Sequence, residues 1–328
     1  MKRASVLFLI VLCFFILVSR QVTDAAGDAE SAAKQRIATP IGFEDPNLEA
    51  AVRNAIGKQS GQLMDTDVMS VNYLDASNCN ISRLGGIEHL TGLTDLDLYN
   101  NRISDISPLA ELTSLEWLNL YCNQVSDIRP LAGLASLTSL WLYGNQISDI
   151  SPLVGILSLW EIDLSGNQIS DISPLAGLTN LEMLNLMSNQ ISDIGPLAGL
   201  ISLNELYLGY NQISDISPLA ALLSLWRLGL GTNQISDIGP LAGLTSVTSL
   251  YVEANQISDI GSLAGLVSLE WLDLRANKIS DISPLTANPG LGQGCTISLD
   301  GNRLDLSPES DDMQTINTLM RRGASVCY

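Results

Sequence analysis

A constant 22-residue spacing of asparagines most limits what this chain can fold into. Nine asparagines share it: Asn101, Asn123, Asn145, Asn167, Asn189, Asn211, Asn233, Asn255 and Asn277. Around each runs one frame, L-x-x-L-x-L-x-x-N-x-I-S-D-I-x-P-L-x-x-L. Cys79 occupies the same column at the front, and Asn302 follows at the back after a three-residue lengthening. The sequence therefore predicts about eleven stacked units rather than one central globular core, because each unit can bury its apolar side only against its neighbours.

The Leu/Asn frame at this period is that of the leucine-rich repeat. In one unit, Leu118 and Leu120 alternate inward on a short strand, which leaves residues 117, 119 and 121 pointing outward. Asn123 follows at a bend, where its amide can donate and accept hydrogen bonds at once. Ser107 and Pro108 are typical of the N-cap and first position of a short helical turn. We predict an α/β solenoid, a right-handed leucine-rich-repeat arc with a parallel concave β-sheet, a helical N-terminal cap and a short C-terminal cap.

A column of aspartates follows the asparagine ladder at the same spacing: Asp105, Asp127, Asp149, Asp171, Asp193, Asp215, Asp237, Asp259 and Asp281. Like charges stacked one unit apart repel unless each carboxylate accepts backbone N–H bonds at its turn. A calcium ladder is the alternative, but the Gly-Gly-x-Gly-x-Asp nonapeptide of such ladders is absent from the sequence. We therefore favour a structural role and expect no metal.

The N-terminal segment has the pattern of an export signal. Lys2 and Arg3 precede fifteen apolar residues from Ala4 to Val18, fewer than the roughly 20 that a membrane span needs. We expect a signal peptide at residues 1–25, with an uncleaved signal anchor as the alternative. No second apolar span follows it. The mature protein is expected to be secreted, periplasmic or on the cell surface.

The remaining boundaries follow from composition and capping signals. Residues 26–41 lack an apolar period and are predicted to form a flexible tether. Residues 42–70 are predicted to form a helical cap, with Asp45 as N-cap and Gly57 ending its helix. Repeats occupy residues 71–303. Residues 304–328 form the C-terminal cap, with a helix from about Met313 to Arg322 and an extended end.

Charge narrows the classes of partner. The formal net charge is −19, and without residues 1–25 the chain keeps 13 basic and 34 acidic residues, a net charge of −21. Such a surface repels phosphate backbones and anionic membranes. We therefore expect no nucleic-acid partner, and we expect a monomer.

Signals for catalysis are absent from the sequence. Its single histidine, His89, lies on the return side of the first unit, and no metalloprotease, nucleophile-elbow or phosphate-loop motif occurs. Gly290, Gly292 and Gly294 belong to the lengthened loop of the last unit. The five cysteines lack zinc-site spacing. We predict that the protein is not an enzyme and carries no cofactor.

The repeat resembles that of the bacterial internalin-like leucine-rich-repeat family. The core Asn-Gln-Ile-Ser-Asp-Ile-Ser-Pro-Leu matches it closely, as does the segment from Phe43 to Arg53, and the resemblance covers about residues 42–303. Members of that family bind proteins on the concave face, several of them at host surfaces. The resemblance implies a bacterial origin, this fold and this mode of binding. It implies no particular partner, and neither an immunoglobulin-like module nor a cell-wall sorting signal follows the repeats.

Aromatic residues gather at the predicted concave positions. Of the 13 Trp and Tyr residues, all but Tyr328 fall there. Strand propensity explains some enrichment, but an exposed patch of this extent is typical of an interface. The candidate partner-binding residues include two methionines and form the following set: Tyr99, Trp117, Tyr121, Trp141, Tyr143, Met183, Met187, Tyr207, Tyr251 and Trp271.

A disulfide between Cys295 and Cys327 is a further expectation. Cys295 opens the last repeat strand and Cys327 lies in the terminal extended segment, which we expect to pack beside it. Both would be in an exported protein, where such bonds persist.

Three functions are compatible with these sequence features. The first is a protein-binding module, such as an adhesin or receptor-like factor. The second is a carbohydrate or cell-wall binder, since Trp and Tyr also stack on sugar rings and neighbouring carboxylates accept sugar hydroxyls. The third is an enzyme or an intracellular repeat protein of the phosphatase-regulating type. Export and the missing catalytic groups favour the first two, and we predict the first.

Overall fold

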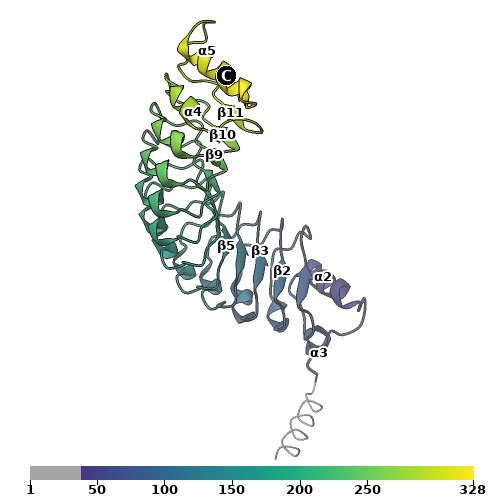
Figure 1. Cartoon of the computed structure of the whole chain (residues 1–328). Coiled ribbons are helices and arrows are strands. Elements are labelled where there is room, and N and C mark those ends of the chain that lie inside the picture. The colour runs from purple at the N-terminus through teal and green to yellow at the C-terminus, as the bar shows by residue number, and fades with distance from the viewer. Residues whose placement is uncertain (1–37) are drawn as a thin grey trace, which may run out of the picture.

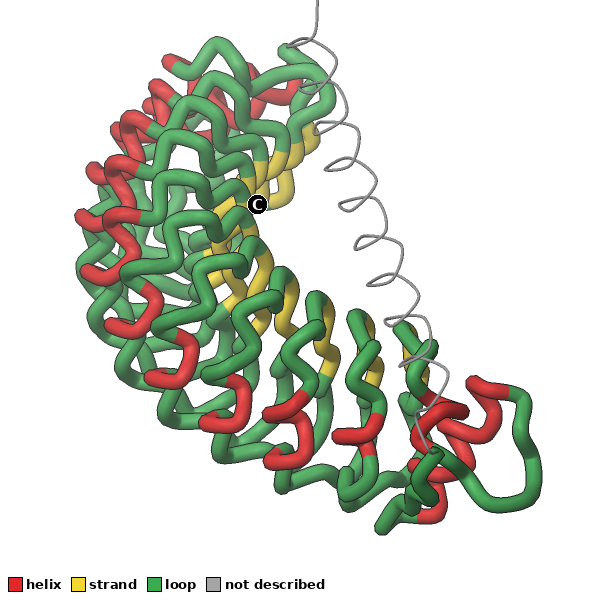
Figure 2. The backbone as a smooth tube through the Cα atoms, turned by 90° about the horizontal axis from the view of Figure 1, so that it is seen from below, coloured by secondary structure: helices red, strands yellow, loops and turns green. Residues whose placement is uncertain are grey.

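The computed structural model describes residues 38–328, so the predicted signal peptide and most of the predicted tether lie outside the described residues. The described chain forms a curved stack of repeats (Figure 1). Strands line the inner side of the arc and short helical turns line its outer side (Figure 2). Within this part of the chain, no helix is long and apolar enough to cross a membrane.

A single parallel sheet runs through the stack, with its twelve strands side by side in chain order. The eleven predicted repeats supply the first eleven strands, and the C-terminal segment adds the twelfth. This confirms the predicted solenoid. The strands are β1 Tyr73–Asp75, β2 Asp95–Asp97, β3 Trp117–Asn119, β4 Ser139–Trp141, β5 Glu161–Asp163, β6 Met183–Asn185, β7 Glu205–Tyr207, β8 Arg227–Gly229, β9 Ser249–Tyr251, β10 Trp271–Asp273, β11 Thr296–Ser298 and β12 Ser325–Cys327.

The core is a set of aliphatic columns that run the length of the stack. Leu118 aligns with Leu96 on one side and Leu140 on the other, and all three are fully buried. Burying one such side chain stabilises the fold by roughly 1.5–3 kcal/mol. Because every repeat adds the same inward residues, stability accumulates repeat by repeat instead of around one centre.

The predicted asparagine ladder is present, with Asn167 as a typical rung. Its Nδ2 donates to the carbonyls of Leu142, Leu164 and Ser165 at 3.0, 3.0 and 3.1 Å. Its Oδ1 accepts the backbone N–H of Ile147 at 3.0 Å. Leu142 and Ile147 belong to the preceding repeat, so each ladder amide joins two repeats.

The outer side of the arc consists mainly of short 3₁₀ turns. They are η1 Ile87–His89, η2 Ser107–Glu111, η3 Arg129–Leu131, η4 Ser151–Leu153, η5 Ser173–Leu175, η6 Gly195–Gly199, η7 Ser217–Ala221, η8 Gly239–Gly243 and η9 Gly261–Gly265. The tenth repeat has the helix α4 Ser283–Ala287 in this place.

Capping of these turns differs from the sequence prediction in one respect. Ser107 is the first residue of η2 rather than its N-cap, which is Ile106 and makes no side-chain capping bond. The backbone N–H of Ser107 instead donates to Asp105 Oδ1 at 2.8 Å, and all nine column aspartates accept the equivalent bond. The carboxylate therefore satisfies the turn, which explains why glycine can replace serine, as at Gly195.

Helices cover both ends of the stack. At the front, α2 Pro46–Ile56 is followed by α3 Asp65–Val68, and Leu48 and Val52 of α2 are fully buried. Asp45 caps α2 by accepting the N–H of Asn47, and Gly57 ends the helix at a φ of 69°. At the back, α5 Asp311–Arg321 precedes β12.

The predicted disulfide is wrong. Strand β12 pairs with β11 so that Cys327 lies opposite Ser298, three residues beyond Cys295. Both cysteines are free, with Cys295 buried and Cys327 exposed. The Cys295 thiol donates to the carbonyls of Leu269 and Gly290 at 3.1 and 3.3 Å, which satisfies it within the core.

Candidate functional site

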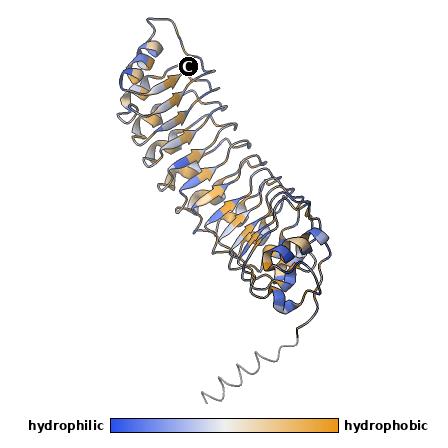
Figure 3. Ribbon diagram, turned by 90° about the vertical axis from the view of Figure 1, so that its right-hand side faces the viewer, coloured by the Kyte–Doolittle hydropathy of each residue, from blue (hydrophilic) through white to orange (hydrophobic). Residues whose placement is uncertain are grey.

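The concave face of the sheet displays three outward residues from each repeat. Two belong to a strand and one follows it, as with Trp117, Asn119 and Tyr121 around β3. Figure 3 views this side of the stack and shows hydrophilic and hydrophobic residues mixed along the strands. Parallel pairing without offsets keeps equivalent residues in straight columns, so a column can be followed from β1 to β11.

Four predicted site residues form one connected group of rings, here called the aromatic cluster: Trp117, Tyr121, Trp141 and Tyr143. Trp141 lies at its centre, with ring centroids 6.2 Å from Trp117 and 5.2 Å from Tyr121. Tyr121 contacts Tyr143 edge to face at 5.4 Å. Tilted and edge-to-face contacts are the arrangements that aromatic rings prefer. Tyr143 is 44% exposed, and the other three are partly exposed, so the cluster offers rigid apolar surface to solvent.

Tyr121 is fixed by a carboxylate two repeats away. Its hydroxyl donates to Asp163 Oδ2, which also accepts Asn185 Nδ2 at 3.0 Å. The other oxygen of Asp163 accepts the N–H and hydroxyl of Ser165. Burial, followed by the bond to Asp163, raises the pKa of Tyr121 well above its ordinary value. The phenol therefore stays protonated and continues to donate.

Trp141 is held by a second chain of hydrogen bonds. Its Nε1–H donates to Ser139 Oγ at 2.8 Å, and the Ser139 hydroxyl donates to Glu161 Oε2 at 2.9 Å. Sequence reasoning missed the roles of Ser139 and Asn185. Their outward column positions are visible in the sequence, but the rotamers that join them to the rings are not.

The other predicted site residues lie on the same face but outside the cluster. Tyr99 is 38% exposed, and within residues 38–328 it makes no ring-to-ring contact. Met183 is the first residue of β6, Met187 lies two residues beyond its end, and both are partly exposed. Tyr207 donates to Glu205 and accepts from Arg227, whose guanidinium lies 4.6 Å from the ring centre of Trp226.

A second aromatic contact lies toward the back of the stack. Tyr251 and Trp271 have ring centroids 6.4 Å apart. In the column that holds Tyr207 and Tyr251, β8 carries Gly229, so one repeat without a side chain at this position separates the two tyrosines. The structure therefore groups four of the ten candidate residues together and leaves the rest in smaller sets.

The outward positions of the face are strongly acidic. In the described repeats they hold only two cations, and both are paired: Arg227 lies 3.6 Å from Glu205, and Arg275 lies 2.5 Å from Asp273. The carboxylates at these positions are Asp75, Asp95, Asp97, Glu161, Asp163, Glu205, Glu253, Asp273 and Asp300. A partner with cationic groups therefore meets a favourable field on this face.

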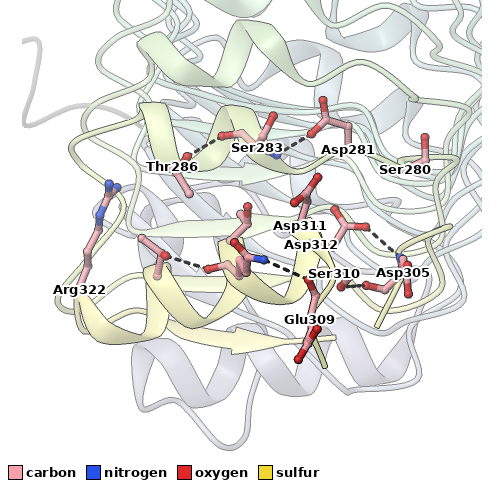
Figure 4. Close-up of a pocket in the computed structure, with 13 residues that line it drawn as sticks. Ser280, Asp281, Ser283, Thr286, Asp305, Glu309, Ser310, Asp311, Asp312 and Arg322 are labelled. Atoms are coloured by element: carbon pink, nitrogen blue, oxygen red, sulfur yellow. Dashed lines mark hydrogen bonds between the residues drawn. The ribbon is translucent and has the colours of Figure 1, made fainter. Parts of the chain in front are cut away.

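A second concave feature lies away from the sheet, at the C-terminal end (Figure 4). It is a hollow of about 990 Å³ between α4 and α5, lined partly by Asp281, Asp305 and Asp312. These carboxylates already accept backbone N–H groups. Asp281 accepts the N–H of Ser283, and Asp312 accepts the N–H of Asp305. Across residues 38–328, no group of three or more His, Cys, Asp or Glu side chains could hold a metal ion. The hollow is therefore a capped turn region.

Family models match most of the repeat array. The "Leucine Rich repeats (2 copies)" model matches residues 70–111, 113–155, 158–199, 179–221 and 201–243, and the "Leucine rich repeat" model matches residues 224–279. No curated protein matched the chain.

Solved structures place the chain more narrowly. An internalin (inlF) of Listeria monocytogenes is 33% identical, with 88% of this chain and 94% of that chain covered and a TM-score of 0.75. A leucine-rich-repeat protein of Leptospira interrogans is 24% identical, with coverage of 80% and 73% and a TM-score of 0.71. The plant peptide hormone receptor RGFR1 in complex with RGF2 is 21% identical, with coverage of 68% and 38% and a TM-score of 0.60. The latter two share the fold, whereas the first is similar over nearly its full length. This chain belongs to the leucine-rich-repeat family and is one of its internalin-like members.

Proposed function

We propose that this chain is an exported, non-catalytic binding protein that recognises a protein partner through the concave face of its sheet. The aromatic cluster carries the proposal, because its rings contact each other, stay partly exposed, and two of them, Tyr121 and Trp141, are held by hydrogen bonds. Rigid Trp and Tyr side chains provide much of the energy of protein interfaces, since they lose little entropy on binding.

Exposed aliphatic residues elsewhere on the molecule are the other apolar surface to consider. Ile201 and Leu223 are exposed and occupy equivalent positions of neighbouring repeats, but Thr179 separates them from the exposed Leu157 in this column, and the column contains no Trp or Tyr. In the plant peptide hormone receptor of the same fold, the solved complex contains RGF2. That structure supports a peptide or protein as the class of partner proposed here.

Carbohydrate binding is the second candidate, because rings beside carboxylates can also hold sugars. The hydrogen bonds of Asp163 argue against carbohydrate binding. Both oxygens of this carboxylate already accept bonds from Tyr121, Asn185 and Ser165, which leaves little capacity for sugar hydroxyls. Its role here is to position Tyr121.

A photo-crosslinking experiment tests the proposal. Benzoyl-phenylalanine replaces Tyr143 at the edge of the aromatic cluster, and in a matched variant it replaces Glu111, an exposed residue of η2 on the convex side. The mature chain is irradiated with cells or extracts, and cross-linked species are identified by mass spectrometry alongside a glycan array. A protein captured only from position 143 supports the proposal. Glycan binding without a cross-linked protein, or capture only from position 111, contradicts it.

Export is tested separately. We expect the mature chain to begin near Ala26 and to occur outside the cytoplasm. Fractionation with N-terminal sequencing measures both. Recovery of an intact N-terminus beginning at Met1 in the membrane fraction would instead establish the signal anchor.

A further inference from the structure

We infer that the partner binds as an extended basic segment, with two cationic side chains flanking apolar residues that cover the aromatic cluster. This inference rests on the proposed function and specifies the chemistry of the partner. It follows from the charges on either side of the cluster, which lie at a fixed spacing along the concave face.

One flank of the cluster is a group of three carboxylates on neighbouring strands, here called the front carboxylates: Asp75, Asp95 and Asp97. Pairing of β1 with β2 places Asp75 directly opposite Asp97 and Tyr73 opposite Asp95. Like charges directly opposite in a sheet are unfavourable. Burial, followed by the charge of Asp75, raises the pKa of Asp97. The outward positions of β1 to β6 hold no Lys or Arg, so no cation of these described strands relieves the repulsion.

The other flank is Glu161, on the far side of the cluster. It accepts one bond at Oε2 from Ser139, and no hydrogen bond to Oε1 is found among the described residues. The side chain is partly exposed. Glu161 therefore has an oxygen available to a partner, in contrast with the fully occupied Asp163.

Asp95 and Glu161 lie in one straight column, with Trp117 and Ser139 between them. Three strand spacings separate them, about 14 Å. An extended chain advances about 3.3–3.6 Å per residue, so two side chains four residues apart span about this distance. A segment that crosses the strands can thus place one cation at each flank and its central residues over Trp117 and Trp141.

Arginine fits the flanks better than lysine. A guanidinium can bond a carboxylate through two N–H groups and lie flat on an aromatic ring at the same time. The protein already uses this combination internally, since Arg227 lies over Trp226 and beside Glu205. A basic extended segment therefore fits both the flanking carboxylates and the aromatic cluster between them. An acidic segment would be repelled at both flanks.

Fluorescence anisotropy with synthetic nine-residue peptides tests this inference on the mature chain. The first peptide has arginines at its second and sixth positions and leucines between them. A spacing control has both arginines adjacent, and a charge control has glutamates in their place. We expect the first peptide to bind about tenfold more tightly than the spacing control, the charge control not to bind, and affinity to fall as salt rises.

Paired variants separate site-specific attraction from the general acidity of the protein. Asp95→Asn with Glu161→Gln removes one charge at each flank, and Glu111→Gln with Glu309→Gln removes two exposed charges elsewhere. We expect the first pair to weaken binding of the spaced peptide about tenfold and the second pair to change it less than twofold. Equal effects of both pairs, or no preference for spacing, would overturn the inference.

The outcomes also distinguish this inference from the proposed function. Neutral or acidic peptides whose binding is lost in Trp141→Ala would refute the basic partner and leave the concave protein-binding face intact. Binding of the spaced peptide that ignores Trp141→Ala would refute both.

Discussion

Each ladder asparagine uses both ends of its amide at once. In Asn167 the NH₂ group joins carbonyls of two repeats, and the carbonyl oxygen accepts the N–H of Ile147. The residue is 8% exposed, so a lost bond cannot be replaced freely by water. A buried backbone group without a partner costs about 1–3 kcal/mol.

Asn167→Ala should therefore lower the free energy of unfolding by roughly 1–3 kcal/mol. Urea unfolding followed by circular dichroism measures the loss. Gln168→Ala is the matched control, because Gln168 is adjacent but exposed, and it should change stability by less than about 0.5 kcal/mol. Equal losses in the two variants would contradict the ladder mechanism.

The residue before each ladder asparagine is held in the left-handed region. Gly144 and Gly166 accept this readily, but Ala254 adopts it with a φ of 52°. A non-glycine residue there costs roughly 1–2 kcal/mol, which exceeds the entropy that glycine adds to the unfolded chain. Ala254→Gly should stabilise the protein by about 0.5 kcal/mol.

Thermal unfolding with a matched variant checks this prediction. Ala132 is exposed in a right-handed turn, with a φ of −58°, so Ala132→Gly should destabilise by about 0.5–1 kcal/mol. The two substitutions should shift the melting temperature in opposite directions. A decrease in both would show that the backbone at Ala254 is not strained.

The roles of single residues were predictable where the same residue recurs at the same position of nine repeats. The ladder and the aspartate column follow from spacing, because one donor–acceptor argument applies to every copy. The bond from Tyr121 to Asp163 was not predictable. It depends on rotamers of two residues 42 positions apart that occur once in the chain.

At the scale of elements, Asp45 joins helix α2 to the first repeat. One oxygen caps the helix at Asn47, and the other accepts the N–H groups of Ser82 and Arg83 and the Ser82 hydroxyl. Burial alone would raise the pKa of Asp45, but these hydrogen bonds outweigh it and hold the pKa below its usual value. Its folded pKa is thus depressed, so its contribution is present above the unfolded pKa, about 3.9, and is lost as pH falls through the folded pKa.

Asp45→Asn should be less stable than the native chain at pH 7, and the difference should shrink as pH falls below about 4. Asp45→Ala removes both sets of bonds and should cost about 2–3 kcal/mol at pH 7. Urea unfolding at pH 7, 5, 4 and 3 provides the comparison. A difference between native and Asn variants that stays constant across this range would exclude a role for the ionised carboxylate.

Repeats are independent elements to a good approximation. Deleting residues 156–177 removes one full repeat and joins Gly155 to Leu178, which occupies the position of Ile156 in the next repeat. Because both Ile156 and Leu178 are buried, the core columns continue across the junction. The shortened chain should fold with the same circular dichroism per residue and unfold cooperatively, at lower stability. An unfolded product would contradict a regular solenoid.

The strands and turns within the repeats were predictable from the sequence. The register of β12 and the structure of the lengthened loop before β11 were less predictable. The apolar period locates the strands and turns because it recurs. Strand β12 has no repeat to set its register, and the disulfide prediction failed there: Cys327 pairs at Ser298, not beside Cys295. Nor does sequence spacing reveal that Asn288, fully buried, anchors the lengthened last loop through the carbonyls of Leu263 and Leu266.

At the scale of the whole molecule, curvature collects outward residues from every repeat on one surface. The arc was predictable, since strands about 4.8 Å apart on one side and turns on the other follow from the repeat frame. Which residues of that surface act together was predictable only in part. Ten residues were candidates, and the structure connects four of them into one group through ring contacts and two more, Tyr251 and Trp271, into a separate pair.

Trp141→Ala combined with Tyr121→Phe tests the central claim that this cluster is the binding surface. The affinity of the partner cross-linked from position 143 is measured by calorimetry, and stability is measured in parallel. Tyr121→Phe keeps the ring but removes the bond to Asp163, so the fold should lose only about 1 kcal/mol. We expect binding to weaken by about 2 kcal/mol or more, roughly 30-fold, and Glu111→Ala on the convex side to leave it unchanged. Binding that survives the concave changes but is lost in Glu111→Ala would show that the partner uses the other face.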